Sequence, residues 1–155
     1  MQIILQREVI FMIEKDTIKL LRECDAGVKM GINAIDDVMD HVKSEKLRSR
    51  LLESRCENEA INNDIQSLLA EYHDEGKEPP AMAKSMAWLK TKTQLTLENS
   101  DSTVADLITD GCNMGIKSIN RYRNQYKAAD ERSKGIVKRI IGTEERLAFD
   151  LRGFL

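Results

Sequence analysis

Four acidic residues are the ones in this chain whose type and spacing could support chemistry. Each is placed on the inner face of a different predicted helix, and they are Asp25, Glu59, Asp110 and Glu144. Carboxylates gathered inside a helical bundle can hold iron or manganese, because their oxygens bind the ions and neutralise their charge. A site of this kind would support oxidase or peroxide-scavenging chemistry.

The histidines that usually complete such a site are missing. Di-iron bundles take a Glu from each of two helices and a Glu-x-x-His from each of the other two. The residues three positions after the two glutamates are Asn62 and Leu147. The only histidines, His41 and His73, lie near predicted helix ends. The sequence therefore favours a protein without a catalytic metal, with iron or manganese at the four acids as the alternative.

Without a metal, the four acids would need another explanation, because inward carboxylates repel one another and are costly to desolvate. Some of them would pair with bases, for which Arg55 is a candidate, or they would be less buried than the helical pattern indicates.

No other pattern in the chain predicts a reaction. The three cysteines, Cys24, Cys56 and Cys112, are odd in number and lack C-x-x-C spacing, so they predict neither a disulfide framework nor a zinc site. All three are expected to be small buried thiols in a reducing compartment, which places the protein in the cytoplasm. There is no glycine-rich phosphate loop and no Ser-His-Asp arrangement, and we therefore predict a protein that is not an enzyme.

A repeated nonapeptide indicates how the chain is built. Residues 27–35 read G-V-K-M-G-I-N-A-I and residues 111–119 read G-C-N-M-G-I-K-S-I. The shared pattern G-x-x-M-G-I-x-x-I predicts two copies of one helical unit. Glycine inside a helix costs about 0.5–1 kcal/mol relative to alanine, so the repeated glycines predict close helix contacts or room for a neighbouring side chain.

Apolar residues recur at helical spacing in four segments, and each segment is preceded by a capping residue. The predicted helices are 16–42, 45–73, 103–126 and 130 onward. Asp16 or Thr17 would cap the first helix and Ser44 the second. A short turn makes the first two helices antiparallel, and the long connection 76–100 is predicted to contain a short helix over 81–95. The fold class is thus an all-α four-helix bundle of two antiparallel hairpins with a long crossover.

Four stretches of the sequence resemble a known family. They read D-A-G-V-K-M-G-I-N-A-I, L-L-E-S-R-C-E-N-E-A, S-M-A-W-L-K and D-G-C-N-M-G-I. Together they resemble a bacterial four-helix-bundle family of unknown function in the ferritin-like, rubrerythrin-related superfamily, over residues 16–152. The resemblance implies a ferritin-like bundle and no established activity. In rubrerythrin-like proteins the first carboxylate would fall where this chain has Asp25 and Asp110.

The N-terminal residues are predicted to lie outside the domain. Residues 1–11 precede the first cap signal, and Q-R-E-V is what a purine-rich ribosome-binding site would encode. We therefore interpret 1–11 as an upstream extension that is not native, and 12–155 as one domain beginning at Met12. The alternative is a short strand or helix that packs its isoleucines on the bundle.

Composition excludes two classes of partner. The 24 basic and 26 acidic residues give a net charge of −2, which argues against nucleic-acid binding by bulk charge. The chain has no run of 18 apolar residues, so the sequence predicts no membrane-spanning helix. We therefore expect the protein to act through a protein partner or self-association, and a small-ligand binder that uses the space beside the glycines is a further alternative.

Overall fold

Four long α-helices account for most of the structure, a computed structural model that describes residues 1–80, 95 and 98–155. The helices are α1 (Gln2–Val38), α2 (Glu45–Ala70), α4 (Asp101–Gln125) and α5 (Glu131–Leu151). Two short 3₁₀ turns, Met39–His41 and Arg152–Phe154, follow α1 and α5. The described part of the chain is thus an all-α bundle of four helices, as the sequence predicts.

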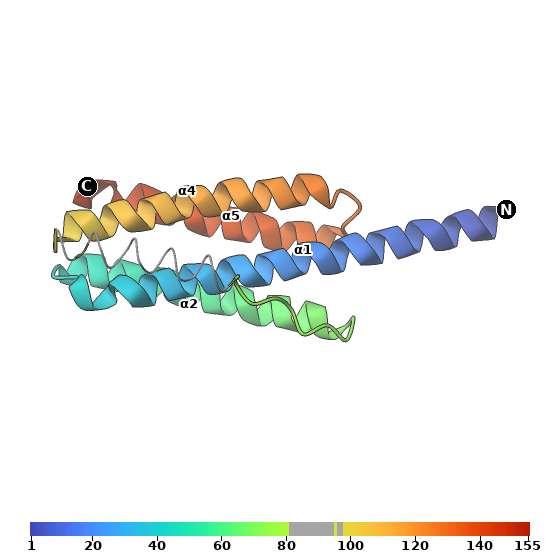
Figure 1. The fold of residues 1–155 in the computed structure, drawn as a ribbon, viewed down its shortest axis with the longest axis horizontal. Coiled ribbons are helices and arrows are strands. Elements are labelled where there is room, and N and C mark those ends of the chain that lie inside the picture. The colour runs from blue at the N-terminus through green and yellow to red at the C-terminus, as the bar shows by residue number, and fades with distance from the viewer. Residues whose placement is uncertain (81–94, 96–97) are drawn as a thin grey trace.

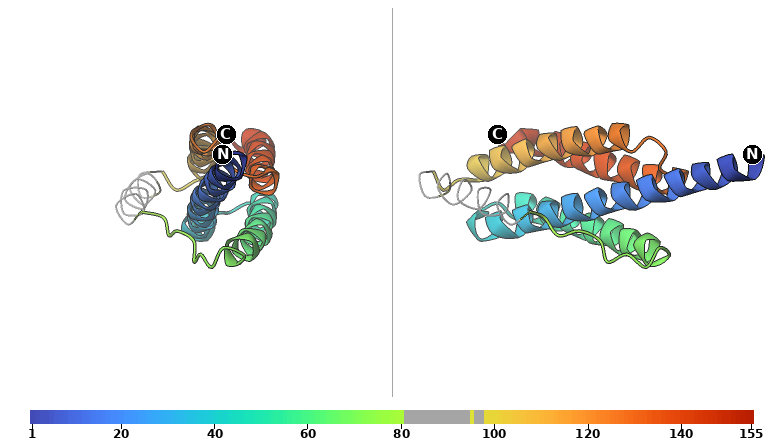
Figure 2. Two further views of the ribbon diagram at one scale, coloured as in Figure 1. Left: turned by 90° about the vertical axis from the view of Figure 1, so that its right-hand side faces the viewer. Right: turned by 45° about the vertical axis from the view of Figure 1, so that its right-hand side comes forward.

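The four helices surround a common core and form two hairpins (Figures 1 and 2). The helix α1 packs most extensively against α2, and α4 against α5. The backbone amides of Lys43 and Ser44, just before α2, donate to the carboxylate of Asp101 at the start of α4, over 2.8 and 3.0 Å. The helices α2 and α4 therefore start at the same end of the bundle.

Side-chain caps begin three of the helices. Ser44 accepts a hydrogen bond from the Leu47 amide at 3.3 Å, Ser100 from Thr103 at 3.1 Å, and Asp130 from Ser133 at 2.8 Å. Each satisfies an amide that the first helical turn leaves without a partner. The predicted cap at Ser44 and the predicted start of the last helix at Asp130 are confirmed.

The predicted start of the first helix at Asp16 is wrong, because α1 begins at Gln2. Residues 2–15 contain no glycine or proline to end the helix, so it continues outward from the bundle. The two residues proposed as its cap instead hold the α4–α5 loop. Asp16 accepts from the Ala128 amide at 3.0 Å, and Thr17 Oγ1 accepts from the Asp130 amide at 2.8 Å.

Residues 1–15 of α1, which we call the arm, project beyond the bundle (Figure 1). Every one of these residues is exposed, including the isoleucines that the alternative interpretation packs on the bundle. That alternative predicts a helix that packs on the bundle. The structure has the helix but not the packing. Whether residues 1–11 are native stays a prediction.

Deletion of residues 1–11 is expected to leave the thermal midpoint within about 2 °C of the full chain, because the exposed arm contributes little buried area to the bundle. Thermal unfolding of the chain beginning at Met12, measured beside the full chain at the same low concentration, checks this. A drop of several degrees would mean that the arm packs on the bundle in solution.

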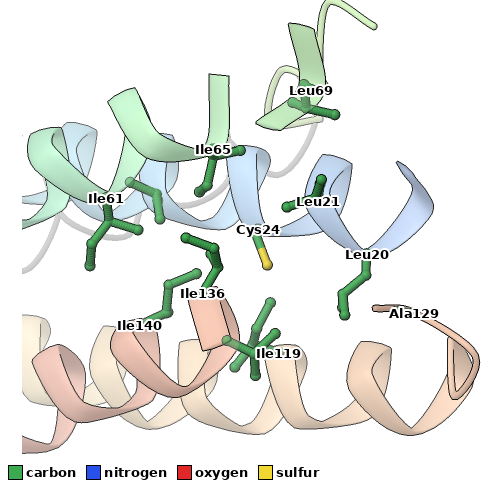
Figure 3. Packing of buried hydrophobic residues seen from close by; sticks show 12 residues of the cluster. Leu20, Leu21, Cys24, Ile61, Ile65, Leu69, Ile119, Ala129, Ile136 and Ile140 are labelled. Carbon is green, nitrogen blue, oxygen red and sulfur yellow. The ribbon is translucent and has the colours of Figure 1, made fainter. Parts of the chain in front are cut away.

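The core consists of two apolar clusters at successive levels of the bundle. Leu20 and Ile65 belong to the first, shown in Figure 3, and Val38 and Leu51 to the second. Between them, every helix contributes a glycine or a polar residue instead of a large apolar one. These residues are Gly31 of α1, Asn58 of α2, Gly115 of α4 and Glu144 of α5.

The predicted helix over 81–95 lies outside the described residues, apart from Leu95, which is buried in the second cluster. Among the helices that the structure describes, none has a stretch long and apolar enough to cross a membrane.

Candidate functional site

The structure does not bring the four candidate acids together. Asp25 is fully buried and Glu144 is partly buried, at different levels of the bundle, whereas Glu59 and Asp110 are on its surface. Within the described ranges, no three His, Cys, Asp or Glu side chains form a group that could hold a metal ion. The alternative of one carboxylate ligand from each helix therefore has no common site among the described residues.

The inward position on α2 belongs to Asn58 rather than to Glu59. The buried stripe of α2 runs through Leu51, Ser54, Asn58 and Ile61, so Glu59 is rotated about 100° away from it. Its carboxylate pairs on the surface with Arg55, which also holds Asp36 at 2.7 Å. The predicted pairing of a candidate acid with Arg55 is thus confirmed.

Asp110 and Asp25 do not occupy equivalent places in the repeat. Asp25 stands two residues before its glycine and Asp110 only one residue before, so the repeat aligns Asp25 with Thr109. One residue along a helix is a rotation of about 100°, which takes Asp110 from the inner face to the surface.

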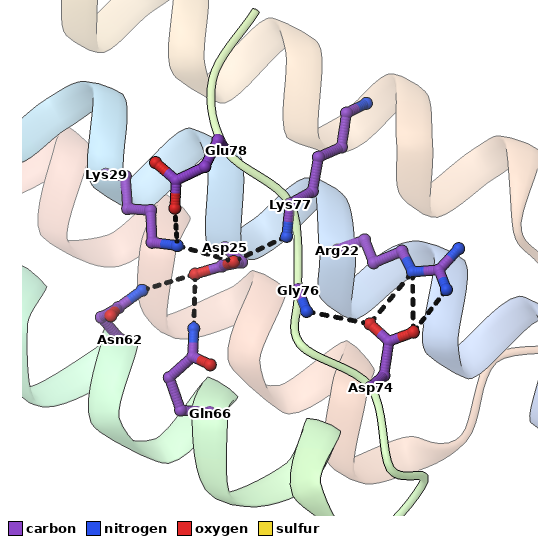
Figure 4. Close-up of polar contacts among 9 residues, drawn as sticks. All are labelled: Arg22, Asp25, Lys29, Asn62, Gln66, Asp74, Gly76, Lys77 and Glu78. Atoms are coloured by element: carbon purple, nitrogen blue, oxygen red, sulfur yellow. Dashed lines mark hydrogen bonds and ion pairs between the residues drawn. The ribbon is translucent and has the colours of Figure 1, made fainter.

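Asp25 is fully buried, and every polar contact of its carboxylate is with a donor (Figure 4). Its Oδ1 accepts from the side chains of Asn62 at 2.8 Å and Gln66 at 2.7 Å, both on α2. Its Oδ2 accepts from the Lys77 backbone amide at 2.8 Å and from Lys29 Nζ at 3.1 Å. Four donors that converge on a buried carboxylate satisfy it without a metal, so this is a structural site that joins α1, α2 and the start of the crossover.

Alternating ion pairs tie the segment 74–78 to α1 around Asp25 (Figure 4). Asp74 pairs with Arg22, Lys77 with Glu23 at 2.5 Å, and Glu78 with Lys29 at 2.6 Å. The hydrogen bond from Arg22 lowers the pKa of Asp74 below its ordinary value. The ion pair therefore stabilises the fold fully at pH values above the unfolded-state pKa of Asp74. This stabilisation is lost as the pH falls through the lower, folded-state pKa of Asp74.

Glu144 is the acid at the centre of the bundle, in the polar layer between the two apolar clusters. A Cβ atom at Gly31 would lie 3.7 Å from Glu144 Oε1 and 3.9 Å from Asn58 Nδ2. A Cβ atom at Gly115 would lie 3.9 Å from the Glu144 carboxyl carbon. The second glycine of each repeat therefore leaves room for this carboxyl group, which is one of the two roles predicted for the glycines.

Burial raises the pKa of Glu144, and a hydrogen bond from the Cys112 thiol opposes that shift. Burial, and next the charge of Glu144, raise the pKa of Cys112 as well. Burial likewise raises the pKa of Cys24 to about 12. Both thiols are therefore protonated and weakly nucleophilic at neutral pH, in agreement with the predicted structural role. For Cys56 the prediction of a buried thiol is wrong, because its position on α2 faces outward and the residue is exposed.

Two buried residues on the inner face of α2 have hydrogen-bonding atoms without a partner. The Oγ of Ser54 and the Oδ1 of Asn58 are buried and unpaired, although the Asn58 amide donates to the Ser54 carbonyl at 3.0 Å. Buried polar atoms in native proteins are nearly always satisfied, and among the described residues Arg50 Nη1 and Thr109 Oγ1 are also buried without a partner. The spacing of Ser54 and Asn58 on the stripe with Leu51 and Ile61 was the sequence signal for this layer.

Glu144→Gln is expected to stabilise the protein at mildly alkaline pH and to have little effect at acidic pH. The pKa of Glu144 is higher in the folded protein than in the unfolded chain. Glu144 therefore stabilises the fold fully at pH values below its unfolded-state pKa, and this contribution is lost as the pH rises through its folded-state pKa. Glutamine does not ionise and avoids this loss. Each unit by which the folded-state pKa exceeds the unfolded-state pKa corresponds to about 1.4 kcal/mol of stability lost at high pH. Urea unfolding across this range checks the trend, with Glu145→Gln on the exposed side of α5 as control. An equal loss at all pH values would contradict it.

The repeated glycines are expected to differ in their response to substitution. Nothing lies within 4 Å of a Cβ at Gly27 or Gly111, so alanine there should stabilise by about 0.5–1 kcal/mol through helix propensity. Leucine at Gly31 or Gly115 would extend into the Glu144 carboxyl and should cost about 1–3 kcal/mol. Chemical unfolding of the four variants measures this, and a destabilising alanine at Gly27 would reveal a helix contact absent from the structure.

Comparison with known proteins gives no matching family model, no similar characterised protein and no similar solved structure.

Proposed function

We propose that this protein acts through contacts with other proteins, without a catalytic metal, and that the arm is the contact surface. One observation carries the proposal: eight large apolar side chains of the arm are between 38% and 68% exposed. They are Ile3, Ile4, Leu5, Val9, Ile10, Phe11, Met12 and Ile13. A contiguous exposed apolar surface of this kind is typical of protein interaction sites.

The arm is apolar on every side, not along a single stripe. Successive residues of a helix are about 100° apart, so the run from Val9 to Ile13 alone covers its whole circumference. A helix that is hydrophobic all round is normally surrounded by other protein. Because the arm is a continuation of α1, the bundle provides its helical nucleus, and a partner would meet a segment that is already ordered.

The finer classification belongs to the same proposal. Two hairpins in which α2 and α4 start at the same end of the bundle support a ferritin-like fold, and the resemblance supports a bacterial family. The three cysteines are free, which supports a reducing compartment and hence the cytoplasm.

The mass of the protein isolated from its own cells tests whether the arm is present. The proposal requires a chain that contains residues 1–11. A native chain that begins at Met12 would remove the contact surface and overturn the proposal, in favour of the interpretation of 1–11 as an upstream extension.

Contact by the arm is tested with a photo-crosslinking amino acid at Phe11, in living cells that make the full chain. We expect covalent adducts with protein at this position. The same substitution at Phe149, an exposed aromatic residue on the bundle itself, is the matched control and should give few. Equal labelling at both positions, or none at Phe11, would contradict the proposal.

A further inference from the structure

We propose that the uncharged side of the arm binds the same side of the arm of a second copy of this chain, and that the two arms run antiparallel. This inference rests on the proposed function, because it names a partner for the same surface. The dimer has two-fold symmetry, and its two bundles lie at opposite ends of the paired arms.

The charged residues of the arm share one side of the helix. They are Arg7, Glu8, Glu14 and Lys15. At about 100° per residue they fall within a sector of about 120°, together with Ile4 and Phe11. The opposite half of the arm has two glutamines and no charge, and its apolar residues are Ile3, Leu5, Val9, Ile10, Met12 and Ile13. One side of the arm is therefore suited to contact with another apolar helix.

This uncharged side continues the face that α1 buries in its own bundle. Thr17, Leu20 and Cys24 are buried on that face. Steps of four and three residues back from Thr17 lead along the same stripe to Ile13, Ile10, Gln6 and Ile3. The arm runs beyond the α4–α5 loop and the end of α2 (Figure 1), and all of its residues are exposed. The stripe is thus a core face without neighbours among the described elements.

Geometry favours an antiparallel second copy on this stripe. Within the bundle, α1 packs against α2, α4 and α5. A second α1 that lay parallel on the stripe would continue into the space that these three helices fill. An antiparallel second copy runs the other way, so its bundle lies beyond residue 1 of the first arm and meets no described element there.

The stripe is also complementary to itself in this orientation. A two-fold axis at residue 8 places Ile3 opposite Ile13 of the second copy, and Gln6 opposite Ile10. The arms then overlap over residues 1–15, a length of about 22 Å, and each reaches the start of the other bundle. Each contact occurs twice, and no charged residue lies between the helices. The side with Ile4 and Phe11 stays outside the pair and accessible to other proteins.

The size of the interface sets the expected strength. Two helices that touch over about 22 Å bury less than the roughly 1,200 Å² in total at which stable interfaces begin. Interfaces of this size belong to weak, reversible complexes. We therefore expect an equilibrium between monomer and dimer, with a dissociation constant on the order of micromolar.

Sedimentation equilibrium of the full chain, at concentrations below and above that constant, tests the dimer. Ile10→Glu should raise the dissociation constant about tenfold or more, because the dimer would bury the new charge between the helices. Met114→Glu is the matched control and should leave the constant unchanged. Ile10 is 63% exposed on the arm and Met114 67% exposed on α4, so neither substitution is expected to unfold the bundle.

Disulfide crosslinking tests the orientation, in chains whose exposed Cys56 is first replaced by serine. A chain with Ile3→Cys is mixed with a chain with Ile13→Cys under mild oxidation. The antiparallel pair brings the two different positions together, whereas like positions are about 15 Å apart, too far for a disulfide. We therefore expect the mixed disulfide to form and each variant alone to form little.

Three results would overturn the proposal: a monomer at every concentration, an Ile10→Glu variant that dimerises as well as the natural chain, or disulfides between like positions. None of them decides the proposed function. Adducts at Phe11 with a different protein would uphold that function although the second copy is not the partner. Dimers of the purified chain without any adduct at Phe11 in cells would uphold the pairing alone.

Discussion

Replacement of Asp25 with asparagine is expected to lower the free energy of unfolding by about 3–5 kcal/mol, the largest effect of any single substitution considered. Both carboxylate oxygens accept from two donors each, so an amide NH₂ group in either orientation would face two other donors. The variant also leaves Lys29 without its buried negative partner. A buried charged network that loses one member keeps the desolvation cost of the rest.

Urea unfolding measures this effect, and Glu59→Gln is its matched control. The sequence pattern treats Asp25 and Glu59 as members of one site, but Glu59 is 47% exposed and pairs with Arg55 on the surface. Exposed ion pairs contribute about 0–1 kcal/mol, so the control should change stability little. Equal losses from the two substitutions would show that Asp25 is accessible to solvent and contradict the prediction.

Gly76→Ala is expected to cost about 2–4 kcal/mol, the next largest effect. Gly76 has φ +90°, a conformation that residues with a side chain rarely adopt. A Cβ there would also lie 2.2 Å from Asp25 Oδ2, so the carboxylate or the loop must move. Either movement breaks the hydrogen bond from the Lys77 amide to Asp25.

The control for Gly76→Ala is the same substitution at Gly135. Gly135 lies inside α5 with nothing within 4 Å of a Cβ, so alanine there should stabilise the helix by about 0.5–1 kcal/mol. Chemical unfolding should therefore show opposite signs for the two variants. The double variant Gly76→Ala with Asp25→Asn should lose less than the sum of the single losses, because both break the same contact. Strict additivity would show that the two residues act separately.

Local signals determined much of the fold from sequence. The helix class, the caps at Ser44 and Asp130 and the short first turn depend on interactions within a few residues, which spacing and residue type display directly. The repeat also identified the positions of Gly31 and Gly115. The prediction that these glycines leave room for a side chain agrees with their place beside Glu144.

The sequence determined less well which face of each helix points into the bundle. Ser54 and Asn58 are polar, so apolar spacing alone did not reveal that the inner face of α2 passes through them. Glu59 is one residue away from that stripe, and an error of one residue turns a side chain by about 100°. The same one-residue offset separates Asp110 from the position equivalent to Asp25.

Tertiary structure alone decided which residues are partners. Asp16 and Thr17 have the residue types of a helix cap, yet they accept from Ala128 and Asp130, more than a hundred positions away in the chain. Asp25 likewise is satisfied by α2 and by the Lys77 amide. A carboxylate or hydroxyl accepts from any donor that packing brings to it, so residue type shows the capacity for a contact and only the fold selects the donor.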